Sequence, residues 1–380
     1  MTEVITEPPV RARPDHRTLR RLAGWYALSR VVVWAAVLGG WALRPELSLD
    51  ALLRRLDASW YLDIARFGYS ARPATPLTLE TDGPEVLRGA FSPLWPLLLR
   101  AVGWTGAPLE IAATLLATLL GFGVVVASWV LVARLADPAA ADRAALLVSF
   151  FPGSVVFSLA YAEALMLCLA TACLYLLLER RWLAAGVVAA LATATRPNAV
   201  ALVAACAWAA AVAIRRDGEW RSLVAPALAP TGAAAFHGFL WWRTSRPDAW
   251  ALIQETGWDE RVDFGARNAE RLVDLVRWSQ PDPGTLVLGL GIVVLAAGAW
   301  ALWRWRPPGV LVVYTAGIVA LALVARTLGP RPRFLLTALP LVWALAVWLR
   351  GERFRAALLA STGGLAVAAL LYIVGSVAKL

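Results

Sequence analysis

Two carboxylates stand among aromatic rings in the stretch RRLDASWYLDIARFGYS, residues 54–70. A single positioned carboxylate can act as a general base, whereas a facing pair can hold a metal ion. In a helix each residue turns by about 100°, so Asp57 shares a side with Trp60 and Tyr61, and Asp63 points about 120° away. The two acids therefore form no chelating pair, and we expect no obligatory metal.

The same stretch predicts an amphipathic helix whose aromatic rings lie at the depth of the lipid headgroups. The spacing of Asp63 and Arg66 suits a local ion pair. An alternative interpretation is that this helix only lies on the membrane and binds nothing.

Further polar residues stand at the ends of apolar segments, where charge is costly and tends to serve a function. Pro197 disfavours helix at the residue before it, so a break is expected at Arg196. Arginine forks suit phosphate better than lysine does. Two alternatives stay open, since Glu163 can be a paired structural carboxylate and Arg196 can extend to the interface. These candidates are Tyr161, Glu163, Arg196, Asn198, Arg331 and Arg333.

The elements that must position these residues are membrane helices. Of the 380 residues, 60% are apolar and 16% charged, and the mean hydropathy is +0.64. Many apolar runs reach about 18 residues, enough to cross a hydrocarbon core of roughly 30 Å. Strand-like alternation is absent, which argues against a membrane barrel. The sequence predicts an all-α polytopic membrane protein.

Charge and composition exclude several classes of function. The net charge of +10 fits basic loops facing anionic lipid, and no aromatic-basic pattern indicates RNA binding. The three cysteines lie inside apolar runs, and there are only two histidines, so no zinc site is expected. No nucleotide-binding glycine motif occurs, and we expect no cofactor.

About eleven transmembrane helices are expected. The segment 90–104 is short, contains two prolines and Arg100, and is interpreted as re-entrant or interfacial rather than as a span. The predicted spans are about 22–43, 108–134, 142–159, 162–178, 181–196, 198–214, 222–242, 284–304, 308–326, 334–350 and 356–378.

Arginine-rich short connections set the expected orientation in the cell membrane. A polar N-terminal tail, residues 1–21, is expected to be disordered and cytoplasmic, followed by one transmembrane domain over 22–380. Two long loops, 44–107 and 243–283, then face outward together with all the candidate residues. The second loop contains a predicted surface helix, 266–278, which can also be interpreted as a lid.

Five motifs, in order, resemble the PIG-V-type mannosyltransferases, bacterial relatives of the second mannosyltransferase of GPI-anchor synthesis. That family belongs to the GT-C class of polytopic glycosyltransferases. Four positions depart from its pattern, with Leu56 in place of Trp, Ser92 in place of Phe, Ala199 or Val200 in place of Gly, and Phe334 in place of Tyr. The motifs are LDASWYLDIARFGY, FSPLWPLLLR, FFPGSVVFSLAYAEAL, ATRPNAV and PRFLLTALPL.

The resemblance implies an inverting hexosyltransferase that moves a sugar, mannose in the family, from a polyprenyl phosphate to an extracytoplasmic glycan or lipid acceptor. Under it, Asp57 is the expected base, and Arg196, Arg333 and Arg331 are expected to hold the donor phosphate. The remaining candidates, expected to contact substrate, are Trp60, Tyr61, Asp63, Tyr161, Glu163 and Asn198.

Two other classes of function remain open from the sequence. A transporter of lipid-linked sugar would place its polar residues near the membrane midplane. A non-catalytic partner subunit would leave them scattered, with Asp57 more than about 15 Å from Arg196 and Arg333.

Overall fold

The computed structural model of the chain describes residues 13–69, 84–277, 279, 283–327 and 329–374. Regular structure in these residues is helical, apart from a single antiparallel bridge between Val262 and Ala325. The predicted all-α architecture is confirmed.

Within these residues, six helical segments are long and apolar enough to cross a membrane, and one bent pair makes a possible seventh. The bent pair, α7 (Pro138–Phe150) and η2 (Pro152–Ser158), meets at 70°. The six are α1 (His16–Ala42), α6 (Leu109–Leu135), η3 (Pro197–Val200) with α10 (Ala201–Asp217), η4 (Trp220–Leu223) with α11 (Val224–Leu228) and α12 (Thr231–Thr244), α15 (Pro283–Trp305) and α19 (Gly351–Val374).

Within the described residues, each of the eleven predicted segments corresponds to helix, but four of them are shorter than a straight span. A helix of 16 residues extends only about 24 Å, less than the roughly 30 Å of a hydrocarbon core. These four are α8 (Glu163–Leu178), α9 (Trp182–Thr193), α16 (Gly309–Val324), and α17 (Pro332–Thr337) with α18 (Leu339–Trp348).

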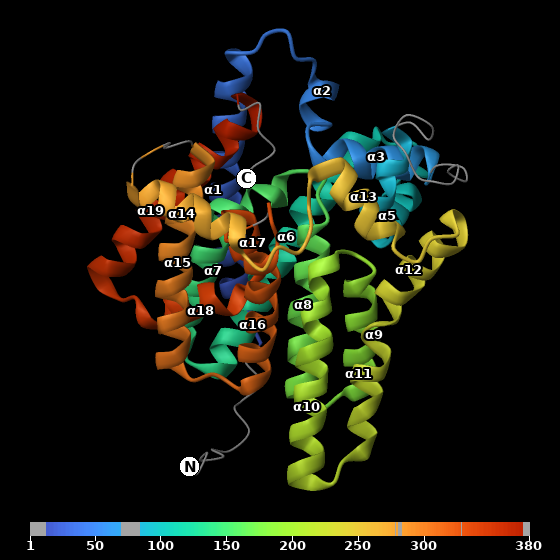
Figure 1. Ribbon diagram of the computed structural model, residues 1–380. Coiled ribbons are helices and arrows are strands. Elements are labelled where there is room, and N and C mark those ends of the chain that lie inside the picture. The colour runs from blue at the N-terminus through green and yellow to red at the C-terminus, as the bar shows by residue number, and fades with distance from the viewer. Residues whose placement is uncertain (1–12, 70–83, 278, 280–282, 328, 375–380) are drawn as a thin grey trace.

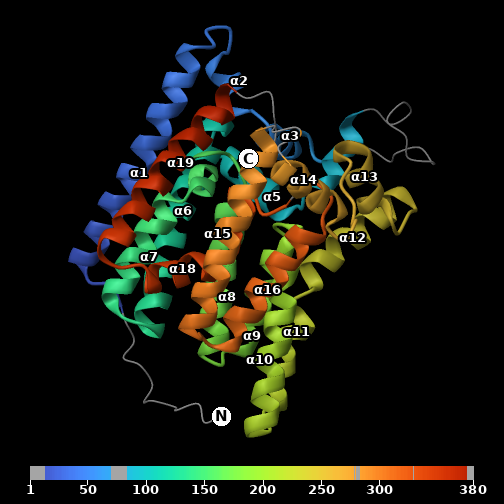
Figure 2. The same cartoon turned by 60° about the vertical axis from the view of Figure 1, so that its left-hand side comes forward.

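The long helices pack side by side, with α1 against α19, α6 against α7 and α8, α10 against α16, and α15 against α18. Figures 1 and 2 show that the short helices gather at one end of this bundle. The connection between α10 and α11 lies at the opposite end (Figure 1). The short helices are α2 (Leu49–Leu53), α3 (Asp57–Phe67), α5 (Leu94–Gly103), α13 (Ala249–Trp258) and α14 (Ala266–Arg277).

The first helix begins earlier than the sequence predicted. Asp15 caps α1 by accepting a hydrogen bond from the backbone N–H of Thr18 at 2.8 Å, so helix starts at His16. Residues 16–21, expected to belong to a disordered tail, are therefore helical. The earlier part of that tail lies outside the described residues.

Helix α5 supports the end of α3 and does not have the length of a span. Its 10 residues extend about 15 Å. Arg100 donates to the carbonyl of Ala65 at 2.7 Å and to that of Ile64 at 3.2 Å. These are carbonyls of the last turn of α3, and that of Ile64 also accepts from the backbone N–H of Gly68 at 2.8 Å. The charge of Arg100 therefore caps α3.

The expected ion pair between Asp63 and Arg66 is wrong. Asp63 lies 2.5 Å from Arg54, which precedes α3, and Arg66 lies 2.5 Å from Glu110 at the start of α6. Arg54 also contacts Glu110, at 3.0 Å. Longer-range partners outcompete the local pair because α6 brings a nearly buried carboxylate between the two arginines.

Helix α14 confirms the predicted surface helix, and Arg267 lies 3.5 Å from Glu270 on it. Its apolar residues Val273 and Val276 are exposed. The buried amide of Asn268 donates to the carbonyl of Leu323, in the last turn of α16, and to that of Ala325, which follows α16. These two hydrogen bonds attach α14 to the bundle.

A buried arginine holds the break between α7 and η2. Pro152 begins η2, where its missing N–H costs nothing. From α1, Arg30 donates to the carbonyls of Ser149 and Ser154 at 2.9 and 2.7 Å, and to the hydroxyls of Ser154 and Ser158. Arg30 also donates to the neighbouring hydroxyl of Ser29. Its five acceptors are thus three serine hydroxyls and two backbone carbonyls, and they take the place of a carboxylate partner.

Replacing Arg30 with Leu is expected to destabilise the protein. The carbonyl of Ser154 would lose its arginine donor, that of Ser149 would keep only the hydroxyl of Ser154, and each buried acceptor left unpaired costs about 1–3 kcal/mol. Thermal unfolding of the purified protein in detergent measures the effect. Arg353→Leu, at an exposed position in α19, is the control. Equal unfolding midpoints for both variants would contradict the role of Arg30.

Candidate active site

A cavity of about 200 Å³ lies where α3, α13, η3 and α17 meet. Its lining combines three arginines, two carboxylates, amide and hydroxyl groups and several aromatic rings. The lining residues are Asp57, Tyr61, Ala90, Phe91, Ser92, Arg196, Pro197, Asn198, Trp250, Gln254, Trp258, Glu260, Thr327, Arg331, Arg333 and Phe334.

Four charged residues from four separate segments form a chain of ion pairs along one wall. Arg333 contacts Asp57 at 2.6 Å and Glu163 at 3.4 Å, and Arg196 contacts Glu163 at 3.0 Å. The side chain of Glu163 has no exposed surface, whereas that of Asp57 is 21% exposed. Glu163 is therefore the buried centre of the chain of pairs, and Asp57 reaches the cavity.

The charge on this wall favours an anion. Arg196, Arg331 and Arg333 all line the cavity, and together they outnumber its two lining carboxylates, Asp57 and Glu260. Burial alone would lower the pKa of Arg333, but the charges of Asp57 and Glu163 outweigh burial and raise that pKa above its ordinary value. The guanidinium of Arg333 is thus fixed in its charged form.

Unsatisfied polar atoms concentrate at the same wall. Among the described residues, nine buried side-chain nitrogen or oxygen atoms have no hydrogen-bond partner, and five of these belong to the site. They are both carboxylate oxygens of Glu163, the Nε atoms of Arg196 and Arg333, and Oδ1 of Asn198. Such atoms are rare because they are costly. Both oxygens of Glu163 and Nε of Arg333 are nevertheless in the ion pairs described above, so Nε of Arg196 and Oδ1 of Asn198 are the two that remain for further contacts.

Local backbone structure places each charged group. Asp57 and Glu163 are the first residues of α3 and α8, where the helix dipole stabilises a carboxylate. Arg196 is extended before Pro197, which confirms the predicted break. Leu56 has a φ of 56°, a region that costs a non-glycine residue about 1–3 kcal/mol. This strained residue turns the chain immediately before Asp57.

The absence of a side chain at Gly153 lets η2 touch the backbone that carries Arg333. A Cβ atom at Gly153 would lie 2.2 Å from the carbonyl oxygen of Pro332 and 3.0 Å from the N atom of Arg333. The break between α7 and η2 therefore sets the position of Arg333 as well as that of Glu163, which follows η2 in the chain.

The second long loop folds over the cavity through backbone pairing. The N–H of Asp263 donates to Val324, and the N–H of Arg326 donates to Arg261, both at 3.0 Å. The carboxylate of Glu260 accepts hydrogen bonds from the hydroxyl and the N–H of Thr327. These contacts bring α13 against the segment that leads into α17.

Aromatic rings from α3, α13 and the residues before α5 pack together at the cavity. Trp60 and Phe91 stack at 5.9 Å, and Trp258 meets them edge-on at 5.8 and 5.5 Å. The indole N–H of Trp250 and the side-chain amide of Gln254 both donate to the carbonyl of Ala90. Helix α13 is thereby fixed to the residues that precede α5.

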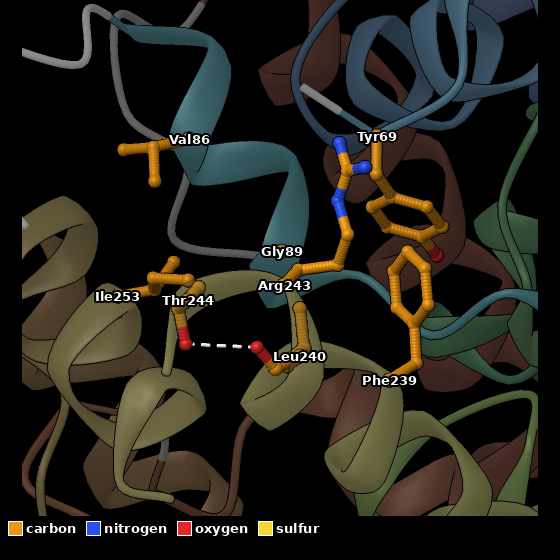
Figure 3. A pocket seen from close by; sticks show the side chains of 8 residues that line it. All are labelled: Tyr69, Val86, Gly89, Phe239, Leu240, Arg243, Thr244 and Ile253. Carbon is orange, nitrogen blue, oxygen red and sulfur yellow. Dashed lines mark hydrogen bonds between the residues drawn. The ribbon is translucent and has the colours of Figure 1, made fainter. Parts of the chain in front are cut away.

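A second, smaller pocket shows how α12, η1 (Pro84–Ala90) and α13 join beside the cavity (Figure 3). A Cβ atom at Gly89 would lie 2.7 Å from Ile253 of α13. Figure 3 shows the side chain of Arg243 directed toward Tyr69, and Thr244 hydrogen-bonded to the carbonyl of Leu240 at 2.8 Å. This tight junction holds α13 in place.

The structure brings most of the predicted residues together. Glu163 lies directly behind the lining, and Tyr161 lines a separate cavity of about 10 Å³ with Asp57 and Arg333. Trp60 does not line the cavity and packs behind two rings that do, those of Phe91 and Trp258. Asp63 is the exception, since its contacts lie with Arg54. The predicted residues that line the main cavity are Asp57, Tyr61, Arg196, Asn198, Arg331 and Arg333.

Sequence reasoning missed the residues that the second long loop contributes. Trp250, Gln254 and Trp258 are spaced by four, so they share one face of a helix. That spacing was the available signal. Glu260 and Thr327 had none, because their contact depends on the pairing of two distant segments.

Within the described residues, no group of three or more histidine, cysteine, aspartate or glutamate side chains is arranged to hold a metal ion. The expectation that no metal is obligatory remains a prediction.

The fold is similar to the crystal structure of the Archaeoglobus fulgidus oligosaccharyltransferase in its apo form, with a TM-score of 0.43 and 14% sequence identity. The similarity covers 91% of this chain and 56% of that one, so this chain spans little more than half the length of the archaeal protein. No protein-family model and no curated protein sequence matches the chain.

Gly153→Ala is expected to lower stability by about 1–3 kcal/mol, because the new methyl group overlaps the backbone of Pro332. Gly363→Ala in α19 is the matched control, since a Cβ there meets nothing within 4 Å. Thermal unfolding of both variants in detergent provides the comparison. If Gly153→Ala is as stable as the control, the close approach does not position Arg333.

Proposed function

We propose that this chain is a membrane glycosyltransferase that transfers a hexose from a polyprenyl-phosphate sugar to an extracytoplasmic acceptor. The observation that carries the proposal is the chain of ion pairs that brings Asp57, Glu163, Arg196 and Arg333 to one cavity. A single base and several guanidinium groups are what such a transfer needs.

In the proposed reaction, the bond between the sugar C1 atom and the phosphate oxygen breaks, and its electron pair stays on the phosphate. An acceptor oxygen forms the new bond to C1 from the opposite side, which inverts that centre. Asp57 takes the acceptor proton. Arg196, Arg333 and Arg331 stabilise the charge that develops on the leaving phosphate.

The position of the cavity supports transfer over the two other classes of function. The cavity lies at the end of the bundle where the short helices gather, whereas a transporter site is expected near the midplane. Asp57 contacts Arg333 directly, whereas a non-catalytic subunit was expected to leave these residues scattered.

The proposed donor is polyprenyl-phosphate mannose and the proposed class is GT-C, both by resemblance to the PIG-V-type enzymes. The proposed location of the site is the outer face of the cell membrane. The arginine-rich connection between α10 and α11 lies at the opposite end of the bundle, which is the arrangement that the positive-inside rule favours.

Asp57→Asn is expected to lower kcat for sugar transfer by about 10²–10⁴-fold, because the amide cannot take the acceptor proton. Transfer is measured in membranes supplied with radiolabelled polyprenyl-phosphate mannose, at equal expression. Asp50→Asn, an exposed acid on α2, is the control. Undiminished transfer by Asp57→Asn would rule out Asp57 as the base.

Arg333→Lys is expected to raise the KM for the donor about ten-fold or more. Lysine keeps the charge but loses the planar fork, and a hydrogen bond to a charged group contributes about 1.5–3 kcal/mol. The same change at Arg326, which pairs with Asp259 outside the cavity, is the control. A donor KM equal to that of wild type would contradict phosphate binding by Arg333.

A further inference from the structure

The cavity has a second wall whose chemistry differs from that of the arginine wall. It consists of Phe91, Trp250, Gln254, Trp258 and Glu260, and α13 contributes three of these. All of α13's contributions come from one helical face and are half-buried. We call these five residues the α13 wall.

Glu260 differs from the other carboxylates of the site. Asp57 and Glu163 both contact arginine, whereas Glu260 has no ion-pair partner among the described residues and is held only by Thr327. An ionised carboxylate accepts hydrogen bonds and donates none. Its oxygens therefore suit the hydroxyl groups of a ligand, and its charge repels an anion.

Aromatic groups beside Glu260 add a preference for a ligand with apolar faces. Trp258 meets Trp60 and Phe91 edge-on, which fixes the orientation of its ring. Gln254 lies one turn before it with a side-chain amide at the cavity. A sugar ring presents C–H groups on its faces and hydroxyls around its edge, so it matches rings and polar groups set side by side.

We propose that the α13 wall is the acceptor subsite and that the acceptor is a neutral saccharide. This inference rests on the proposed transferase function and assigns the half of the cavity that the donor phosphate does not need. A lipid-phosphate acceptor at this wall would face the uncompensated charge of Glu260. A purely apolar acceptor would remove water from the charge of Glu260 and leave it Thr327 alone as a hydrogen-bond partner, which is costly.

Binding is tested first without turnover, by saturation-transfer NMR on the purified full chain in nanodiscs. The probes are the methyl glycosides of mannose, glucose and glucuronic acid, of which the last differs from the glucoside by a carboxylate. Wild type is expected to bind the two neutral probes and to discriminate at least ten-fold against the glucuronide. Trp258→Ala is expected to lose the signal, and Glu260→Gln to abolish the discrimination.

Matched controls lie outside the cavity. Glu255→Gln removes a charge from the same helix at a residue that pairs with Arg261, and Trp104→Ala removes an exposed tryptophan at the end of α5. Both are expected to bind as wild type does. Absence of binding by wild type, or equal binding of all three probes by wild type, would overturn the proposal.

A transfer assay then separates acceptor from donor. Trp258→Ala is expected to raise the KM for a saccharide acceptor at least ten-fold and to leave the KM for the polyprenyl-phosphate sugar unchanged. A raised donor KM with an unchanged acceptor KM would place the donor sugar at this wall and overturn the proposal. If wild type binds neutral probes but transfers nothing from the donor, the proposed transferase function fails, while saccharide binding stands.

Discussion

Glu163 has no exposed side-chain surface, and its charge is stable there only because Arg196 and Arg333 lie against its two oxygens. A buried carboxylate without such partners is strongly destabilising. The three residues come from α8, the turn before η3, and α17, so one electrostatic requirement fixes three distant segments relative to one another. Asp57 joins this arrangement through Arg333 and adds a fourth segment, α3.

Backbone contacts hold the segments that carry Glu163 and Arg333 in the positions that allow these ion pairs. The bend between α7 and η2 directs the chain toward Glu163, and Arg30 satisfies the carbonyls and hydroxyls that the bend leaves open. At that bend, Gly153 lets the backbone before Arg333 approach within contact. Steric fit and charge pairing therefore act on the same few residues, which explains how a site made of separate segments remains ordered.

Periodicity and composition predicted the fold well because span-forming segments are long and nearly continuous in sequence. All eleven predicted segments are helical, and the break at Arg196 follows directly from Pro197. Span lengths were less predictable, since α8 is largely buried among its neighbours and does not need the full thickness of a bilayer, while α9 is short although Leu183, Val187 and Leu191 are exposed. The tail was predicted too long because a single capping residue, Asp15, extends α1.

The residues of the candidate site were predictable where a charged side chain stands at the end of an apolar segment. Asp57, Arg196 and Arg333 met that condition, and the structure brings them to one cavity. Asp63 met it as well, but it pairs with Arg54 and does not reach the cavity. Glu110 of α6 binds both Arg54 and Arg66, so Arg66 is not available to Asp63. Partners far apart in sequence decided that outcome, and local spacing carries no information about them.

Charge balance explains why a site already filled with ion pairs can still serve a transfer. Glu163 is fully buried and keeps its two arginines, whereas Asp57 lies at the cavity edge. In the proposed reaction the acceptor proton neutralises Asp57 while negative charge builds on the leaving phosphate. Arg333, 2.6 Å from Asp57, loses one anionic partner as another forms beside it. The wall gains one unit of positive charge as the phosphate gains one of negative charge, so wall and phosphate together carry the same total charge before and after transfer.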